Sequence, residues 1–261
     1  MVLIFDLDGV LVTSNFFADI LIKEICQRFS ENAICVEKPA IYQEILKRFV
    51  NKLGAEKKVL AYDWDLIVRE YLEEYNLTWT CEIEEFFKSE DLIKYTFLYK
   101  DVEVLEWLFQ KGYEMAILTN GLHKYQDQVI KKLGLERFFM KIVMPNPENY
   151  KFIKPYPDIF KILSQEFQKP HIMIGDSLFF DIYGAKSVGY ETIWIIRKIP
   201  KKYKELSIPE RTAKINNNEK FLLKHIIRSA PFLELSQEKI NFDEYKPDYI
   251  INNLYELKEL F

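Results

Sequence analysis

Six polar residues follow short apolar segments of this chain, either directly or in the loop or helix that comes next, and their types suit one kind of chemistry. They are Asp6, Asp8, Thr119, Lys154, Asp176 and Asp181. Carboxylates gathered at one place repel one another and need a cation, and a cluster of oxygen ligands suits Mg²⁺. The set therefore predicts a magnesium site with a hydroxyl and an ammonium group beside it.

A site of this composition is suited to phosphoryl transfer. The transition state carries negative charge on the phosphoryl oxygens, which a metal ion, a lysine and backbone N–H groups stabilise. One carboxylate can attack phosphorus and form an aspartyl phosphate, and a second can protonate the leaving oxygen and later activate water. Asp6 and Asp8, two residues apart, offer both groups.

The elements that would position these residues alternate between strand and helix patterns. Residues 2–5 form a short apolar run, and after Tyr99 strand and helix patterns follow one another up to about residue 197. This alternation predicts βαβ units and a doubly wound parallel sheet, a Rossmann-like α/β fold. Because ligands bind beyond the carboxyl ends of parallel strands, we expect the six residues to meet at one edge of the sheet.

A block of different character interrupts this pattern between residues 15 and 97. Its apolar residues are spaced by three and four, and Gly54 is its one glycine. The spacing predicts four amphipathic helices. They cover residues 16–29, 39–53, 55–77 and 81–97.

A second interruption covers about residues 199–246, where the pattern is mixed. Within it, residues 216–230 predict a helix that begins with an asparagine cap. The last stretch, 247–261, predicts a final strand and helix. We expect the interruption to be an elaboration of the core or, second, a dimer contact.

Composition narrows the function classes. The chain has 261 residues, of which 49% are hydrophobic and 29% charged, and its net charge of −4 offers no basic surface for nucleic acid. No apolar run is long enough to span a membrane, and the acids after residue 5 do not fit a signal peptide. Three cysteines make no disulfide framework, although a Cys26–Cys35 bridge stays open. We expect a cytoplasmic protein, a monomer or a homodimer.

Four stretches resemble, in order, the motifs of the haloacid dehalogenase superfamily of phosphatases. They are "FDLDGVL", "ILTNG", "IKPYPDIF" and "IGDSLFFDIYGAKSVGYETIWI". The resemblance implies a core of residues 1–14 and 98–261, with the extra insert at about 199–246. It also implies that residues 15–97 are a helical cap domain that excludes water and selects a small phosphorylated metabolite.

The same resemblance implies a role for each site residue. Asp6 resembles the nucleophile, and Asp8 resembles the general acid and base. Mg²⁺ would be held by Asp6, by the backbone carbonyl of Asp8 and by Asp176. Phosphoryl oxygens would be bound by the Thr119 hydroxyl, the Asn120 N–H and Lys154, and Asp181 would orient Lys154 or a metal-bound water.

Two departures from the family pattern bear on the site. Residue 180 is Phe180, where relatives often carry asparagine, so a supporting hydrogen bond would be missing. The loop before the third motif offers a competing Lys151. We favour Lys154 because it directly precedes "PYPDIF".

Several alternatives stay open. A sugar phosphomutase of the same family would return the phosphoryl group to a sugar and fits "FDLDGV" equally well. A 2-haloacid dehalogenase fits less well because it needs no acid for a phosphate leaving group. From another class, a phosphorylatable receiver-type switch also gathers acids, a threonine and a lysine at the end of a parallel sheet.

Other candidates are left outside the predicted site. His123 is interpreted as a surface histidine, and Ser177 as a helix cap. Trp64 and Trp79 could stack on a substrate, but helix packing is the simpler interpretation. The cations Arg48, Lys57, Lys58 and Arg69 are expected on a solvated helix face.

Overall fold

The computed structural model describes residues 1–80, 82–146, 148, 152–234 and 240–261, and its centre is a six-stranded sheet. All five strand pairs are parallel, in the order β5-β4-β1-β6-β7-β8, so the predicted doubly wound α/β fold is confirmed. The strands are β1 (Val2–Phe5), β4 (Glu114–Leu118), β5 (Lys141–Val143), β6 (His171–Gly175), β7 (Glu191–Ile195) and β8 (Tyr249–Ile251).

Both faces of β1 are buried, which explains why its sequence is continuously apolar rather than alternating. Leu3 and Phe5 belong to the hydrophobic cluster on one face, and Val2 and Ile4 belong to the cluster on the other. The helices that accompany the sheet are α5 (Val104–Gln110), α6 (His123–Lys132), α7 (Pro157–Glu166), α8 (Gly184–Lys186) and α12 (Leu257–Leu260).

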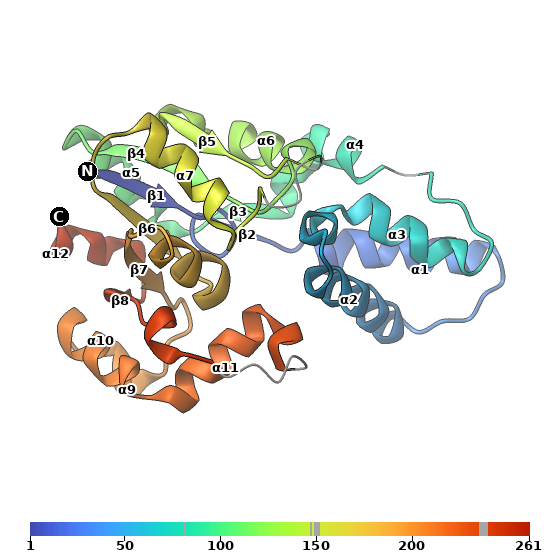
Figure 1. Ribbon diagram of the computed structural model, residues 1–261. Coiled ribbons are helices and arrows are strands. Elements are labelled where there is room, and N and C mark those ends of the chain that lie inside the picture. Colours follow the sequence, from blue (N-terminus) through green and yellow to red (C-terminus); the bar gives the residue numbers. More distant parts are fainter. Residues whose placement is uncertain (81, 147, 149–151, 235–239) are drawn as a thin grey trace.

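A group of helices stands beside the carboxyl end of the sheet. Figure 1 shows α1, α2 and α3 to one side, with the arrow of β1 pointing toward them and the N-terminus at the opposite end. The predicted block of four helices contains α1 (Ile22–Glu31), α2 (Lys38–Gly54), α3 (Trp64–Glu73) and α4 (Ile83–Lys88).

Two of the four predicted helices differ in extent from the structure. The helix expected over 55–77 is broken, because the Asp63 side chain accepts a hydrogen bond from the Leu66 N–H and starts α3 afresh. The helix expected over 81–97 ends at Lys88. The chain then forms the strand β3 (Thr96–Leu98), antiparallel to β2 (Val12–Ser14), so that a two-stranded ribbon joins the block to the sheet. Residue 81 lies outside the described residues.

The second interruption forms further helices between β7 and β8. The predicted helix over 216–230 is confirmed as α11 (Glu219–Ser229), with the Asn218 side chain accepting from the Phe221 N–H. Two helices that the mixed pattern did not predict precede it, α9 (Lys201–Lys204) and α10 (Ile208–Asn216). Ser207 and Glu210 form a capping box at the start of α10, a local signal present in the sequence.

This insert also contacts the helical block. Phe232 follows α11, and the Lys58 ammonium lies 5.0 Å from the centroid of its ring. Leu53 and Ala61 share a hydrophobic cluster with Ile226. The insert therefore connects the sheet to the helices at its carboxyl end.

Two expectations on the chain as a whole can be compared with the structure. Within the described residues, no helix is long and apolar enough to cross a membrane. Cys26 and Cys35 are both free thiols, so the disulfide that the sequence left open is not formed.

Candidate active site

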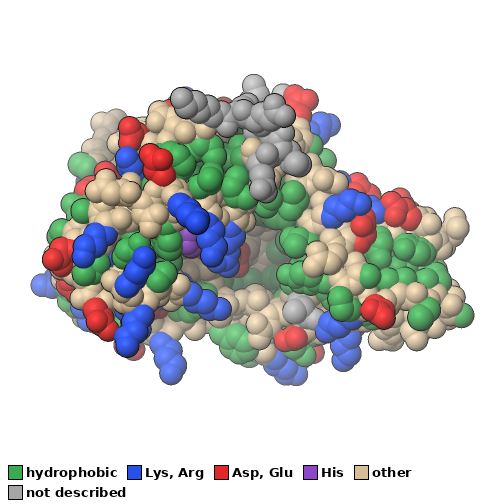
Figure 2. Space-filling model, turned by 90° about the horizontal axis from the view of Figure 1, so that it is seen from below, with side chains coloured by type: hydrophobic (Ala, Val, Ile, Leu, Met, Phe, Trp, Pro, Cys, Tyr) green, Lys and Arg blue, Asp and Glu red, His purple; other side chains and the backbone are tan. Residues whose placement is uncertain are grey.

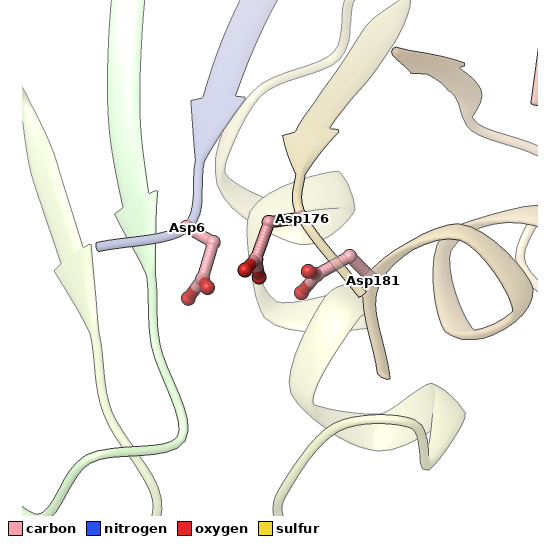
Figure 3. A group of neighbouring side chains, drawn as sticks. All are labelled: Asp6, Asp176 and Asp181. Carbon is pink, nitrogen blue, oxygen red and sulfur yellow. The ribbon is translucent and has the colours of Figure 1, made fainter. Parts of the chain in front are cut away.

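Three carboxylates meet at the carboxyl ends of the central strands. Asp6 directly follows β1, Asp176 directly follows the neighbouring β6, and Asp181 lies in the helical turn Leu178–Tyr183. One oxygen of each carboxylate lies within 4.8 Å of the others, and Figure 3 shows the three side chains pointing toward a common centre. Parallel neighbouring strands bring residues far apart in sequence to the same edge.

Lys154 lies between two of these carboxylates and is almost fully buried. Its ammonium Nζ donates to Asp6 Oδ1 at 2.7 Å and to Asp181 Oδ1 at 2.6 Å. Burial alone would lower the pKa of Lys154, but the carboxylates of Asp181 and Asp6 outweigh it and raise that pKa. Lys154 is therefore charged and balances part of the negative charge. The competing Lys151 lies outside the described residues.

The acids are held in surroundings that oppose their negative charge. Burial raises the pKa of Asp6 well above its usual value, Lys154 lowers it in part, and Asp181 and Asp176 raise it further. The surrounding protein, which keeps water from part of the carboxylate, and the neighbouring Asp181 raise the pKa of Asp176 to about 7. A divalent cation among these oxygens would relieve the crowding, so the donor set fits Mg²⁺.

Asp8 opens onto the same cavity, and its carboxylate bonds the side chain of Gln126. Its Oδ2 accepts a hydrogen bond from Gln126 Nε2 at 2.6 Å. The surrounding protein raises the pKa of Asp8, and the Gln126 contact lowers it in part. Gln126 is a residue that sequence reasoning missed, because a glutamine in the helix pattern after "ILTNG" carries no signal of its own.

Gly9 lets the chain turn directly after Asp8. Its φ of +80° is in the left-handed region, and a Cβ placed there would lie 2.3 Å from Asp176 Oδ2. Glycine is therefore required by both the backbone conformation and the space around the carboxylates.

Thr119 and Asn120 follow β4 at the same edge and are both buried. Thr119 Oγ1 accepts from the Gly121 N–H at 3.1 Å. The Asn120 side chain contacts the Lys154 backbone in both directions, accepting from its N–H at 2.9 Å and donating to its carbonyl at 3.2 Å. The side chain of Asn120 thus positions Lys154, a contact that the motif by itself did not predict.

The loop after β6 has its own supports. Ser177 N–H donates to Asp181 Oδ2 at 3.0 Å, and the Ser177 hydroxyl accepts from the Phe180 N–H, which agrees with its interpretation as a helix cap. Phe180 itself lines the cavity and offers no hydrogen bond from its side chain. Trp194 Nε1 donates to the Asp176 carbonyl at 2.9 Å and anchors the backbone of that residue.

Arg197 supports the loop that carries Asp8. Its Nε donates to the Gly9 carbonyl at 3.3 Å, and its guanidinium also bonds the Val10 carbonyl and the carboxylate of Asp101. The same group lies 3.9 Å from the centroid of the Tyr99 ring. Sequence reasoning missed Arg197 because its partners lie about a hundred or more positions away along the chain.

A cavity of about 450 Å³ unites these groups. Its wall includes every site residue that the sequence predicted, namely Asp6, Asp8, Thr119, Asn120, Lys154, Asp176 and Asp181. Trp64 also lines it, whereas Trp79 is buried and donates from Nε1 to Asp65 at 2.9 Å. The packing interpretation was therefore right for Trp79 and incomplete for Trp64.

His123 and the four cations that the sequence left outside the site do not line this cavity. The His123 side chain is 76% exposed, as expected of a surface histidine. None of the four cations Arg48, Lys57, Lys58 and Arg69 lines the cavity. Arg48 instead contacts Glu74 at 2.6 Å, and Lys58 donates to the Leu53 carbonyl.

Polar contacts join the helical block to α6 beside the cavity. Lys124 Nζ donates to Asp63 Oδ1 at 2.8 Å, and the Tyr125 hydroxyl donates to Asp65 Oδ2 at 2.8 Å. Tyr62, which lies in the block, accepts from Asn120 Nδ2 at 3.1 Å. Side chains of the block therefore border the site and touch its polar groups.

Comparison with known proteins gives one family. The model of the haloacid dehalogenase-like hydrolases matches residues 1–189. Glyceraldehyde 3-phosphate phosphatase of Pyrococcus furiosus is 32% identical over 200 residues, which are 74% of this chain and 79% of that protein. Phosphoglycolate phosphatase of Haemophilus influenzae is 26% identical over 190 residues, 71% of this chain and 80% of that protein.

Solved structures show the same fold. A HAD phosphatase from Thermococcus onnurineus has a TM-score of 0.67 at 23% identity and covers 99% of this chain and 96% of its own. L-2-haloacid dehalogenase from Xanthobacter autotrophicus has a TM-score of 0.57 at 17% identity, covering 99% and 97%. Because the fold is shared by a phosphatase and a dehalogenase, the fold alone does not decide the reaction.

Proposed function

The chain belongs to the haloacid dehalogenase-like hydrolases and is a phosphatase of that family, and we propose that it hydrolyses small phosphate monoesters with Mg²⁺ through an aspartyl phosphate on Asp6. One observation carries the proposal. Asp6 bonds the Lys154 ammonium within a cluster of three carboxylates, while Asp8, two residues on, opens onto the same cavity.

The metal would be held by Asp6, the Asp8 carbonyl and Asp176, and bound Mg²⁺ supplies positive charge that stabilises the phosphoryl oxygens. Asp6 must be ionised to attack, although burial raises its pKa. Lys154 supports the ionised form from 2.7 Å. The Thr119 hydroxyl and the Asn120 N–H are proposed to bind phosphoryl oxygens.

The reaction needs a phosphoryl transfer and proton transfers. Asp6 accepts the phosphoryl group, and Asp8 carries the protons. An oxygen of Asp6 bonds to phosphorus while the bond from phosphorus to the ester oxygen breaks, and the Asp8 carboxyl gives its proton to that oxygen. Asp8 then takes a proton from water as the water oxygen bonds to phosphorus. The bond to Asp6 breaks, which releases phosphate and restores the Asp6 carboxylate and the protonated Asp8 carboxyl group.

Two features suit Asp8 to the proton transfers. Its raised pKa favours the protonated form that the first transfer requires. The hydrogen bond from Gln126 fixes the orientation of the carboxyl group. Residues 15–97 are proposed to act as the cap, because Tyr62 and Asp63 from this block contact Asn120 and Lys124 beside the cavity.

The test is phosphate release from a panel of phosphate monoesters, with and without Mg²⁺. We expect turnover that is lost with EDTA and lost in Asp6→Asn. Asp158→Asn, an exposed aspartate on α7, serves as the matched control and keeps full activity. Mass spectrometry of acid-quenched enzyme should find one phosphoryl group on the peptide that contains Asp6.

The outcomes separate the alternatives. Full phosphate release by Asp6→Asn would overturn the assignment of the nucleophile. Turnover that needs a sugar bisphosphate and yields an isomer would indicate a phosphomutase. A single phosphorylation without turnover would indicate a receiver-type switch, and halide release from a 2-haloacid in place of phosphate release would indicate a dehalogenase.

A further inference from the structure

The cavity has two chemically different parts. Its polar groups come from the edge of the sheet, where the carboxylates, Thr119 and Lys154 lie. Its other wall includes four aromatic side chains of the helical block, Phe17, Phe49, Tyr62 and Trp64, here called the aromatic panel. A phosphate ester bound with its phosphorus beside Asp6 can place its leaving group in the remaining space of this cavity, next to the panel.

The panel is an ordered arrangement of rings. Phe49 and Trp64 are stacked, with ring centroids 5.2 Å apart and planes inclined by 15°. Phe17 meets Trp64 edge-on at 5.2 Å, and Phe49 meets Tyr62 edge-on at 5.7 Å. Because the rings hold one another in place, they lose little side-chain entropy when a flat group of a ligand binds against them.

The rings are packed without being fully buried. All four side chains of the panel are half-buried, whereas Phe16 and Phe87, which line the same cavity, are 6% and 8% exposed. Figure 2 shows hydrophobic side chains bordering the central hollow on the side of α1–α3. Packing of the helical block alone accounts for Phe16 and Phe87, but it leaves the open ring surface of the panel without a partner in the described structure.

Charge in the cavity restricts the leaving group further. Among the described residues that line it, Lys154 is the one cation, and its ammonium is already bonded to Asp6 and Asp181. The basic residues Lys198 and Arg228 line a neighbouring hollow to which no member of the aromatic panel belongs. A carboxylate or second phosphate beside the panel would therefore be desolvated without a counter-ion.

We propose that the natural substrate of this cavity is a phosphate monoester of an uncharged alcohol that carries a flat unsaturated ring, with the ring stacked on the aromatic panel. This inference rests on the proposed phosphatase function. Trp64 and Phe49 determine the specificity by contacting the ring, while the groups at the sheet edge handle the phosphoryl group.

Three synthetic esters test this with matched leaving groups. Benzyl phosphate, cyclohexylmethyl phosphate and para-carboxybenzyl phosphate all release a primary alcohol. Differences in kcat/KM between them therefore measure how the leaving group interacts with the aromatic panel. We expect benzyl phosphate to exceed cyclohexylmethyl phosphate about fivefold, since aromatic contacts add roughly 1 kcal/mol beyond area. We expect the carboxylated ester to fall at least about tenfold below benzyl phosphate.

Variants of two panel residues test whether the preference for the aromatic ester depends on the panel. Trp64→Leu and, separately, Phe49→Leu should each lower kcat/KM for benzyl phosphate about tenfold, a clearly larger loss than for methyl phosphate, which has no ring. Phe109→Leu is the matched control, because Phe109 is 53% exposed on α5 and lies outside the cavity. Circular dichroism checks that each variant is folded.

Each result bears on a defined claim. A preference for the carboxylated ester, or equal losses for methyl and benzyl phosphate in both variants, overturns the ring proposal and leaves the phosphatase in place. If no ester is hydrolysed, including methyl phosphate, the proposed function fails and the ring proposal fails with it.

Discussion

Lys154 is the residue on which the charge balance of the site depends. It is nearly fully buried, and it bonds Asp6 and Asp181 at 2.7 and 2.6 Å. A buried ion pair of this kind contributes little net stability, but removing one partner leaves uncompensated charge. Its value therefore lies in keeping Asp6 ionised next to other carboxylates.

Lys154→Met should reduce both activity and stability. Losing the cation leaves Asp6 and Asp181 buried without their partner, which costs about 3–5 kcal/mol in comparable cases. We expect kcat to fall at least about a hundredfold, because a charge that stabilises the phosphoryl oxygens is lost. Steady-state kinetics and thermal unfolding measure the two effects.

Lys169→Met is the control for that variant. Lys169 forms an ion pair of similar length, 2.8 Å to Glu114, but its side chain is 51% exposed. Such exposed pairs contribute little, so this variant should behave as the wild type. A Lys154→Met enzyme with wild-type kcat would exclude Lys154 from the chemistry.

Asp176 makes the stability of the metal-free protein depend on pH. Its pKa is raised to about 7 from 3.8, so the folded state binds more protons than the unfolded state between these values. Stability from this group therefore falls as pH rises through that window. His225, whose pKa is lowered to about 4 by burial, acts in the opposite sense over the acid range.

A variant isolates the contribution of Asp176 from that of His225. In EDTA, Asp176→Asn should gain stability over the wild type as pH rises from about 5 to about 8, because it carries no charge to desolvate. Adding Mg²⁺ at about pH 8 should raise the melting temperature of the wild type and not of the variant. A stability difference that is flat across pH would contradict the shifted pKa.

At the scale of elements, the conformation of the loop of residues 6–12 depends on its own glycine and on a side chain from another part of the chain. Arg197, beyond the end of β7, bonds the carbonyls of Gly9 and Val10 and the Asp101 carboxylate. Second-layer contacts of this kind orient metal ligands. The same loop carries Asp6 and the Asp8 carbonyl, which are the proposed ligands.

Arg197→Lys should weaken metal binding more than chemistry. A lysine keeps the charge but cannot bond three acceptors in the planar arrangement of a guanidinium. We expect the Mg²⁺ concentration for half-maximal activity to rise about tenfold, with kcat largely recovered at saturating Mg²⁺. Magnesium titrations of activity measure this.

An exposed arginine provides the comparison for Arg197. The Arg137 side chain is 70% exposed and pairs with Glu106, not with the loop of residues 6–12. Arg137→Lys should therefore leave the magnesium titration unchanged. If Arg197→Lys lowered kcat at every Mg²⁺ concentration with no change in half-saturation, the arginine would not act through the metal site.

For the whole molecule, the insert between β7 and β8 joins the core to the helical block. Phe232 lies under Lys58 of the block, and its ring meets Phe179, next to the cavity residue Phe180, at 5.5 Å. The polar contacts of Lys124 and Tyr125 join the block to the core from α6. The insert therefore adds a second set of contacts between the core and the helical block.

Phe232→Ala should make closure of the block less favourable. The half-buried ring packs against Lys58 of the block and Phe179 of the core, so we expect its loss to lower the melting temperature by a few degrees. We also expect a KM about threefold higher, with a smaller change in kcat. Leu223→Ala, an exposed position on α11 of the same insert, should change neither. Equal KM values in Phe232→Ala and wild type would show that the insert does not bias closure.

Local patterns in the sequence determined the fold class and the polar groups of the site. Apolar runs that end in aspartate or threonine imply strands whose carboxyl ends carry reactive groups, because parallel strands share one edge. The sequence alone could therefore place seven residues together, although their individual roles stay predictions: Asp6, Asp8, Thr119, Asn120, Lys154, Asp176 and Asp181. The asparagine cap of α11 was likewise readable, since capping depends on neighbours in the chain.

Tertiary structure alone decided which further side chains reach those groups. Gln126 meets Asp8 from α6, Arg197 meets Gly9 from beyond β7, and Trp64 faces the cavity while Trp79 is buried. Spacing along a chain determines which face of a helix a residue occupies, but the partner of that face depends on how distant elements pack. For this reason the sequence indicated a phosphoryl site, and the packing of the helical block shaped the space for its leaving group.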